Sequence, residues 1–257
     1  MKLTLTLTLL LLTLLSNAQQ KLIYLDDNGK SVSEKKAVTL EQHVKINDTL
    51  YEVNTYAVDG PRATSMQYSD SKGETLNGRY ITYDRKGRGQ TVGQYSHGQK
   101  EGTWYQLTST SRVLRAEIYQ NGKLIAKKDS TQLNEEEEKI ADSLKKLPNA
   151  IEVESDFVGG PSAWLEYLNN HLKYPQHAVD KSIQGSPLIS FVVEKDGKII
   201  PEKIFLVWSV EYTLDTEALR VIKGSPDWTP AQQGGQTVRS WKKQPIVFSL
   251  APAPKKS

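Results

Sequence analysis

The chain has 257 residues, of which 37% are hydrophobic and 25% are charged, so it can bury a core and is long enough for two small domains. Its net charge of +3 is mild, and no clustered basic face suggests a nucleic-acid partner. The sequence contains no cysteine, which excludes disulfides, thiolate metal sites, a cysteine nucleophile and a lipidated cysteine anchor.

Residues 1–18 have the pattern of a secretory signal peptide. Lys2 gives a short positive start, an apolar run follows, and small residues occupy Ser16 and Ala18 before the expected cleavage point. The alternative is an uncleaved membrane anchor, but the apolar run of about 13 residues spans only about 20 Å as a helix, against a hydrocarbon core of about 30 Å. We therefore expect a periplasmic protein with a cleaved signal peptide, and membrane association remains the alternative.

Strand and turn patterns fill residues 19–128. A glycine followed two residues later by an aromatic occurs at Gly78–Tyr80 and again 24 residues later at Gly102–Trp104. Residues 95–100 and 119–123 repeat at the same distance. A period of this size indicates stacked units, and each unit is expected to be a β-hairpin with glycine in its turn. Residues from about 50 to 127 resemble MORN-type repeats and the related antitoxin-like repeat proteins.

Residues 129–150 have the composition of an acidic helical linker. Four consecutive glutamates, Glu135 to Glu138, come before apolar residues at helical spacing, and Pro148 ends the pattern. The acidic run lacks the alternating ligand spacing of a calcium loop. We interpret it as a solvated spacer between two domains.

Two helices are expected after residue 157. The apolar positions of the first helix recur at helical spacing, with Ser162 as its N-cap. Tyr174 ends this helix because a residue that precedes a proline is pushed out of the helical region. Pro175 can then begin a short second helix that runs to about Ser182. The apolar positions of the first helix are Trp164, Leu165, Leu168 and Leu172.

A β-hairpin follows between residues 184 and 207. Ile189, Phe191 and Val193 alternate with other residues, which puts one apolar row on a single face of a strand. Asp196-Gly197 then favours a tight turn. The returning strand is expected to run through Ile199, Ile204 and Val207.

A third helix and a last strand complete the chain. Thr213 is expected to cap the helix, whose apolar face contains Leu214, Ala218, Val221 and Ile222. The last strand is expected from about Thr237 to Leu250, and Pro245 favours an edge position because proline cannot donate to a ladder. The sequence thus predicts an α+β chain: an N-terminal all-β hairpin-repeat domain, and a C-terminal domain with a three-stranded antiparallel sheet and flanking helices.

Residues 151–252 resemble the C-terminal domain of TonB-family proteins, leaving residues 253–257 as a tail. The order of the elements agrees with that family, and so do short landmarks spread along the segment. These landmarks are Tyr174, Pro175, Gln184, Gly185, Asp196, Gly197, Trp228 and Pro230.

The resemblance implies a binding function. TonB-family domains capture a short extended segment of an outer-membrane receptor by adding it to the exposed edge of their last strand, a mode in which main-chain hydrogen bonds supply the affinity. Carried over to this chain, the docking edge is Val238, Arg239, Ser240, Trp241 and Lys242. The alternative interpretation of the same residues is a charged edge that only guards against aggregation.

The resulting prediction is an exported periplasmic protein that binds an outer-membrane receptor or another envelope protein. The alternatives are a membrane-anchored energy transducer for outer-membrane transport, and a structural module that binds peptidoglycan glycan. We expect no enzyme activity, cofactor or metal, because no nucleophile, base and orienting group occur in a recognisable pattern, and the four histidines lack metal-ligand spacing. The sequence does not determine the oligomeric state.

Overall fold

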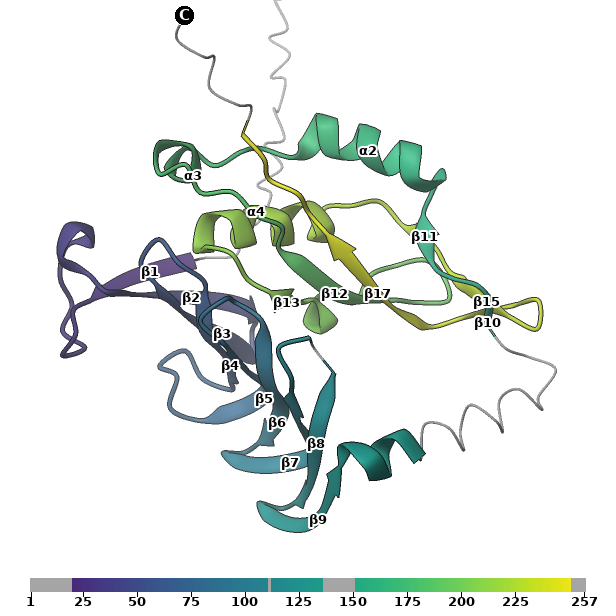
Figure 1. Ribbon diagram of the computed structural model, residues 1–257, viewed down its shortest axis with the longest axis horizontal. Coiled ribbons are helices and arrows are strands. Elements are labelled where there is room, and N and C mark those ends of the chain that lie inside the picture. Colours follow the sequence, from purple (N-terminus) through teal and green to yellow (C-terminus); the bar gives the residue numbers. More distant parts are fainter. Residues whose placement is uncertain (1–19, 111, 136–150, 251–257) are drawn as a thin grey trace, which may run out of the picture.

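The computed structural model describes residues 20–110, 112–135 and 151–250. The predicted signal peptide, most of the predicted linker and the predicted tail lie outside these residues. The described chain is mixed α and β, as predicted: a large N-terminal sheet lies against a smaller C-terminal sheet that carries helices (Figure 1).

The N-terminal part is a nine-stranded sheet in which every strand pairs antiparallel with the next strand in the chain. A short 3-10 helix, η1 (Glu34–Lys36), follows the first strand. The strands are β1 (Gln20–Leu25), β2 (Thr39–Asn47), β3 (Leu50–Ala57), β4 (Arg62–Tyr68), β5 (Leu76–Tyr83), β6 (Gly89–Ser96), β7 (Gln99–Leu107), β8 (Val113–Gln120) and β9 (Lys123–Asp129).

The 24-residue period recurs in the geometry of the turns. His97-Gly98 and Asn121-Gly122 both have two positive φ angles, the backbone of a type I′ hairpin turn. Gly98 donates its N–H to the carbonyl of Leu76, and Gly122 donates to the carbonyl of Lys100 in the same way. These two hairpins therefore share a turn of the same geometry with glycine at its second position. Their assignment to the MORN type remains a prediction.

The C-terminal part has a three-stranded antiparallel sheet in the order β13-β12-β17, with shorter strand pairs beside it. Its principal elements are α2 (Gly160–His171), α3 (Gln176–Asp180), β12 (Leu188–Val193), η2 (Pro201–Lys203), β13 (Phe205–Trp208), α4 (Tyr212–Lys223) and β17 (Ser240–Pro245). The shorter strands are β10 (Ile151–Val153), β11 (Asp156–Phe157), β14 (Trp228–Thr229), β15 (Ala231–Gln233) and β16 (Gln236–Val238).

The three helices pack on one face of this sheet. Ile189, Phe191 and Val193 of β12 are fully buried there, as their alternation predicts. The apolar face predicted for α4 is also fully buried. In α2 the prediction is only partly right, because Leu165 is 60% exposed while Trp164 is buried.

Several predicted boundaries are wrong, for local reasons. Gly159, not Ser162, is the N-cap of α2, because its positive φ of 87° turns the chain into the helix. Glu211, not Thr213, caps α4, since its carboxylate accepts from the N–H and hydroxyl of Thr213. The returning strand is interrupted by η2 at Pro201, and only residues 205–208 form β13. The last strand is split at Arg239 into β16 and β17.

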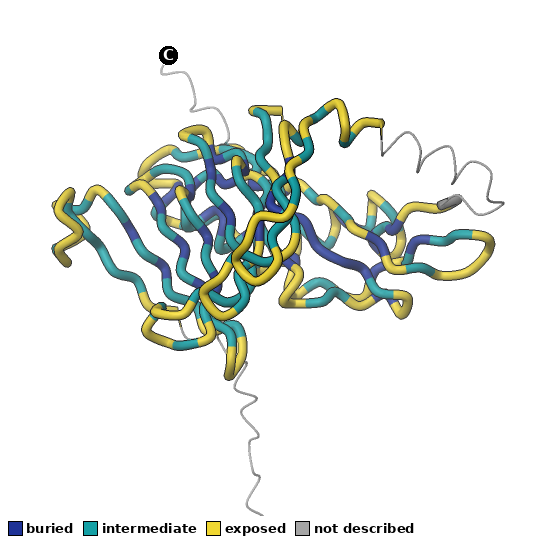
Figure 2. The backbone as a smooth tube through the Cα atoms, turned by 90° about the horizontal axis from the view of Figure 1, so that it is seen from below, coloured by how far each residue is buried: buried dark blue, intermediate teal, exposed yellow. Residues whose placement is uncertain are grey.

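The second face of the C-terminal sheet lies toward the N-terminal sheet (Figure 1). Ser190 and Val192 of β12 point to this side and are buried, although no helix covers them. Figure 2 shows buried residues running through the strands of both parts of the molecule. The N-terminal sheet therefore serves as a second layer over the C-terminal domain.

No helix in the described part is long and apolar enough to cross a membrane.

Candidate partner-binding edge

The predicted docking strand, β17, lies at an edge of its sheet. It pairs antiparallel with β12 from Ser240 opposite Val193 to Pro245 opposite Leu188. Within the described residues no strand pairs with its other side. Pro245 ends the strand, in agreement with the edge position predicted from its missing N–H.

The register shows which main-chain groups of β17 are free. Ile246 donates its N–H to Pro187 at 3.0 Å, and Phe248 exchanges two hydrogen bonds with Gly185. Alternate residues of an antiparallel strand point their main-chain groups to the same side, so Ser240, Lys242 and Gln244 also face β12. The N–H and C=O groups of Trp241 and Lys243 therefore point away from β12, in the plane of the sheet, toward its open edge.

The side chains of the predicted site divide into two groups. Lys242 Nζ donates to the carbonyl of Ser155 at 2.6 Å and lies 3.6 Å from Asp156 Oδ1, so its ammonium is held against the strand. Trp241 lies on the other face, 56% exposed, with its ring edge-on to Phe205 at 5.8 Å between centroids. Arg239 forms an ion pair with Glu194 at 2.5 Å.

Val238 does not share the edge that was predicted for it. It belongs to β16 and pairs with Ala231 of β15. The sequence analysis also missed Lys243, whose outward main-chain groups are equivalent to those of Trp241. Lys243 is identified only by the register of β17 on β12, which decides whether odd- or even-numbered residues face outward. The sequence does not indicate that register.

The opposite edge of the sheet is closed by the N-terminal part. Ser209, directly after β13, donates its N–H to the carbonyl of Gly87 at 2.8 Å, and Arg88 bridges to Trp208. The hydroxyl of Tyr83 donates to the carbonyl of Leu206 at 2.9 Å. The turn between β5 and β6 thus satisfies main-chain groups that a free β13 would expose to other chains.

A buried polar cluster supports this closed edge. The hydroxyl of Ser209 accepts from the N–H of Arg62 at 2.8 Å and donates to Asp215 Oδ2 at 2.5 Å. The guanidinium of Arg62 in turn donates to the hydroxyl of Tyr56. Burial raises the pKa of Asp215 to about 6, although the positive charge of Arg62 opposes the rise. Arg62 and Asp215 are at most 2% exposed, so neither charge is solvated by water. Both charged groups are stabilised instead by contacts between the two domains.

A second, more exposed contact joins the turn after β3 to α3. Asp59 accepts from His177 Nε2 and from Lys181 Nζ, both at 2.8 Å. The hydrogen bond from Lys181 lowers the pKa of Asp59, with burial acting in the opposite direction. Gln42 of β2 adds a hydrogen bond to Thr216 of α4 at 2.9 Å.

The family landmarks fix the fold rather than the edge. Tyr174 donates its hydroxyl to the carbonyl of Ile183, and Gln184 accepts from the N–H of Leu250. Gly197 has a φ of 87° and lies so close to Trp228 that a Cβ would come within 2.3 Å of the tryptophan carbonyl oxygen. The remaining landmarks lie in turns or at element ends: Pro175 at the N-cap of α3, Gly185 in a bridge to Phe248, Asp196 in the β12 turn, and Pro230 between β14 and β15.

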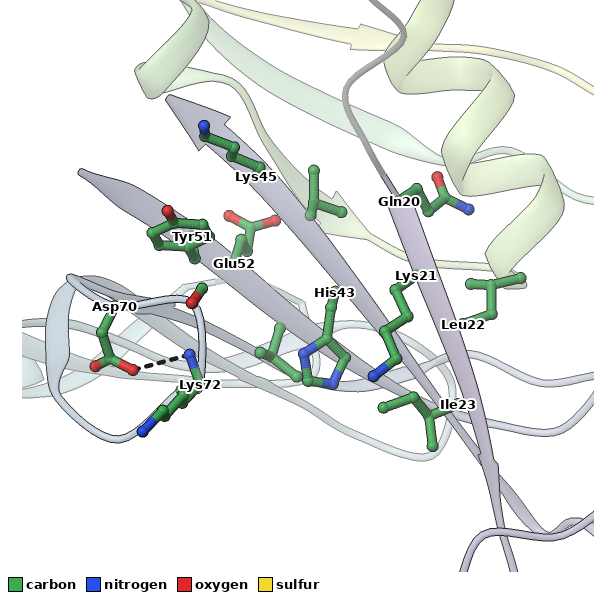
Figure 3. A pocket seen from close by; sticks show the side chains of 14 residues that line it. Gln20, Lys21, Leu22, Ile23, His43, Lys45, Tyr51, Glu52, Asp70 and Lys72 are labelled. Atoms are coloured by element: carbon green, nitrogen blue, oxygen red, sulfur yellow. Dashed lines mark hydrogen bonds between the residues drawn. The ribbon is translucent and has the colours of Figure 1, made fainter. Parts of the chain in front are cut away.

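An open groove of about 960 Å³ lies elsewhere, along β1, β2, β3 and the turn from Asp70 to Gly73 (Figure 3). Lys21 and His43 line it from neighbouring strands, and Asp70 accepts a hydrogen bond from the N–H of Lys72 at its rim. It does not include β17. The described residues contain no group of three or more histidine, aspartate or glutamate side chains placed to hold a metal ion.

Comparison with known proteins agrees with the predicted resemblance. A family model described as the Gram-negative bacterial TonB protein C-terminal matches residues 170–250. No curated protein and no solved structure matches the chain. The matched segment begins near the end of α2 and contains α3, α4 and the whole three-stranded sheet. Residues 170–250 are therefore similar to the C-terminal domain of Gram-negative bacterial TonB proteins.

Proposed function

We propose that the protein is an exported binding protein of the cell envelope that captures an extended segment of another envelope protein, of the outer-membrane receptor type, on the free edge of β17. The observation that supports the proposal most directly is the pair of outward main-chain groups at Trp241 and Lys243. An extended peptide can add to such an edge as a fourth strand. The closed edge at β13 leaves β17 as the edge of this sheet that can accept it.

The proposal narrows the predicted site. The docking strand consists of Ser240, Trp241, Lys242 and Lys243. Arg239 directly precedes this strand and forms an ion pair with Glu194. Val238 belongs to the neighbouring hairpin and is left out. Ser240 and Lys242 hold the strand to β12, whereas Trp241 and Lys243 supply the groups that a partner strand can reach.

The experiment tests main-chain pairing at one position. Nine-residue extended peptides from a displayed library are selected on the mature protein, and the affinity of the best binder is measured by calorimetry. Lys243→Pro removes an outward N–H without removing a bond to β12, and we expect it to weaken binding at least about tenfold. Lys243→Ala is the matched control, because it removes the charged side chain and keeps the N–H.

Two outcomes would count against the proposal. If Lys243→Pro and Lys243→Ala bind the peptide equally, the outward N–H has no part in capture. If no extended peptide binds the wild-type protein, β17 is a guarded edge and not a docking strand. Circular dichroism of both variants excludes unfolding as the cause of a loss.

The location of the protein is part of the proposal and is tested separately. We propose a periplasmic protein that begins at Gln19 after cleavage, in line with the family and with the signal pattern of residues 1–18. The intact mass of the protein purified from fractionated envelopes distinguishes the cleaved form from the uncleaved form. A membrane-bound species that retains Met1 would support the energy-transducer alternative and contradict a cleaved, freely diffusing protein.

A further inference from the structure

A cleft of about 240 Å³ lies between the two sheets beside β17. The C-terminal wall contains Ser190, Phe205, Val207 and Lys243, which share the sheet face that is turned away from the helices. The N-terminal wall is apolar and comes from four successive strands of the N-terminal sheet, β5 to β8. It consists of Ile81, Gly89, Val92, Tyr105, Leu107 and Val113.

The cleft reaches the edge strand through Lys243, whereas its other C-terminal residues lie on β12 and β13. Lys243 lies opposite Ser190 in the ladder, and residues opposite one another in an antiparallel pair share a face. Lys243 therefore projects toward the N-terminal sheet from the strand edge itself. Whichever way a peptide runs along β17, every second side chain of the peptide faces the same side, because side chains alternate along a strand.

The size of the cleft favours a side chain over a free small molecule. Sites for drug-sized ligands are about 300 to 1,000 Å³, so a cleft of about 240 Å³ lies just below that range. One large apolar side chain, carried on a strand that is already held by main-chain bonds, suits this space better. Tyr105, 38% exposed, gives the cleft an accessible aromatic wall.

The charge of the cleft selects the neighbouring residue of the partner. Lys243 is exposed and makes no hydrogen bond or ion pair with any described residue, in contrast to Lys242, which is held by Ser155 and Asp156. A free ammonium beside an apolar wall favours an acidic group that approaches along β17.

We propose that the N-terminal repeat sheet is the second wall of the peptide site, so that the partner is an extended segment with a large apolar residue in the cleft and an acidic residue two positions before or after it. The inference depends on the proposed function, because it assigns side-chain selectivity to the strand that β17 captures. It gives the repeat sheet a role in recognition in addition to closing the β13 edge.

The test is a double-mutant cycle on the mature full chain. The probe is the best nine-residue peptide from the displayed library, together with its variant in which the cleft residue is alanine. On the wild-type protein we expect the alanine peptide to bind about tenfold more weakly. On Tyr105→Ala that difference should shrink to about twofold or less, since the wall that contacts the side chain is missing. Leu124→Ala is the control, an exposed apolar residue on β9 outside the cleft.

A charge arm uses Lys243→Gln, which keeps the main-chain N–H. We expect libraries selected on this variant to lose the enrichment of acidic residues at the position two away from the apolar residue. Decanoate, an apolar acid without a peptide backbone, is added as a competitor to wild-type protein. If decanoate binds in a Tyr105-dependent manner and no peptide does, the cleft is a small-molecule site and the inference is wrong.

The outcomes separate the two proposals. If Lys243→Pro abolishes capture but Tyr105→Ala leaves the selected pattern and the alanine penalty unchanged, β17 docks peptides and the N-terminal wall does not select them. If Lys243→Pro binds as well as Lys243→Ala, strand addition itself fails, and the inference fails with it. Loss of the alanine penalty on Tyr105→Ala, with binding otherwise retained, supports both.

Discussion

The two edges of the C-terminal sheet are treated in opposite ways. At β13 the carbonyl of Gly87 accepts from the N–H of Ser209, and the side-chain hydroxyl of Tyr83 donates to the carbonyl of Leu206. At β17 the outward groups of Trp241 and Lys243 have no strand partner in the described chain. An unpaired edge promotes aggregation unless it is guarded or used. The N-terminal sheet thus covers one edge of the domain and leaves the other uncovered, which is the arrangement that the proposed peptide capture requires.

Hydrogen exchange measures this difference directly, and the expected effect is large. The N–H of Ser209 and the β12-facing N–H groups of Lys242 and Gln244 should exchange at least about a thousandfold more slowly than those of Trp241 and Lys243. The comparison within β17 is internally controlled, because neighbouring residues share the same strand. Equal protection along the whole strand would mean that another copy or another segment covers the edge.

Breaking the closed edge should cost the most stability. Gly87 has a φ of 77°, and a Cβ there would lie 2.0 Å from the carbonyl oxygen of Ser209. We expect Gly87→Ala to lower the free energy of unfolding by about 2 to 4 kcal/mol, from backbone strain together with the lost contact. Chemical denaturation provides the measurement.

Gly98→Ala is the matched control for this substitution. Gly98 has a nearly identical φ of 78° but nothing within 4 Å of the added Cβ, so it reports the backbone strain alone, about 1 to 2 kcal/mol. Equal losses in the two variants would mean that the approach of Gly87 to Ser209 contributes nothing to stability.

The elements within the C-terminal domain could be predicted because their signals are local. The alternation of Ile189, Phe191 and Val193 requires a strand with one buried face, and the spacing of Leu214, Ala218 and Val221 requires an amphipathic helix. The caps were less predictable, since a glycine with positive φ or a glutamate can replace a serine or threonine at a helix start. Gly159 and Glu211 do so here.

The closed edge and the cleft could not be predicted from the sequence. Gly87 and Ser209 are more than a hundred residues apart, and nothing in their local sequence indicates that they meet. The free groups of β17 depend on whether odd or even residues face β12, and a shift of one residue would exchange them. The resemblance selected Val238, which lies in β16, and omitted Lys243, which lies in β17.

The contribution of Asp215 to the stability of the folded protein should depend on pH. Because burial raises its pKa from 3.8 to about 6, the folded protein binds this proton more readily than the unfolded chain between about pH 4 and 6. The stability contributed by this proton is fully present below about pH 4 and is lost as the pH rises through about 6.

Asp215→Asn removes this titration. The free energy of unfolding of the variant minus that of the wild type should increase by about 2 kcal/mol from pH 4.5 to pH 7, because only the wild type loses stability over this range. Denaturant titrations of both proteins at the two pH values give the comparison. A difference that does not change with pH would mean that Asp215 titrates as an ordinary carboxyl group in the folded protein.

The smallest expected effect concerns Asp59, whose exposed contact joins the same two domains. Asp59→Asn keeps a residue type that tolerates the positive φ of 55° and removes only the charge that His177 and Lys181 contact. We expect a loss of about 0.5 kcal/mol at low salt that disappears near 1 M salt, because exposed ion pairs are weak and screened.

Asp196→Asn is the control for this change, since Asp196 pairs with Lys198 inside the C-terminal domain. If Asp59→Asn instead costs as much as Gly87→Ala, and salt does not reduce the loss, the exposed pair has a larger part in domain docking than its exposure allows. A small, salt-sensitive loss would place the strength of the docking in the buried contacts of Gly87, Arg62 and Ser209. The edge at β13 would then stay closed while the charges around it titrate, and β17 would remain the edge open to a partner.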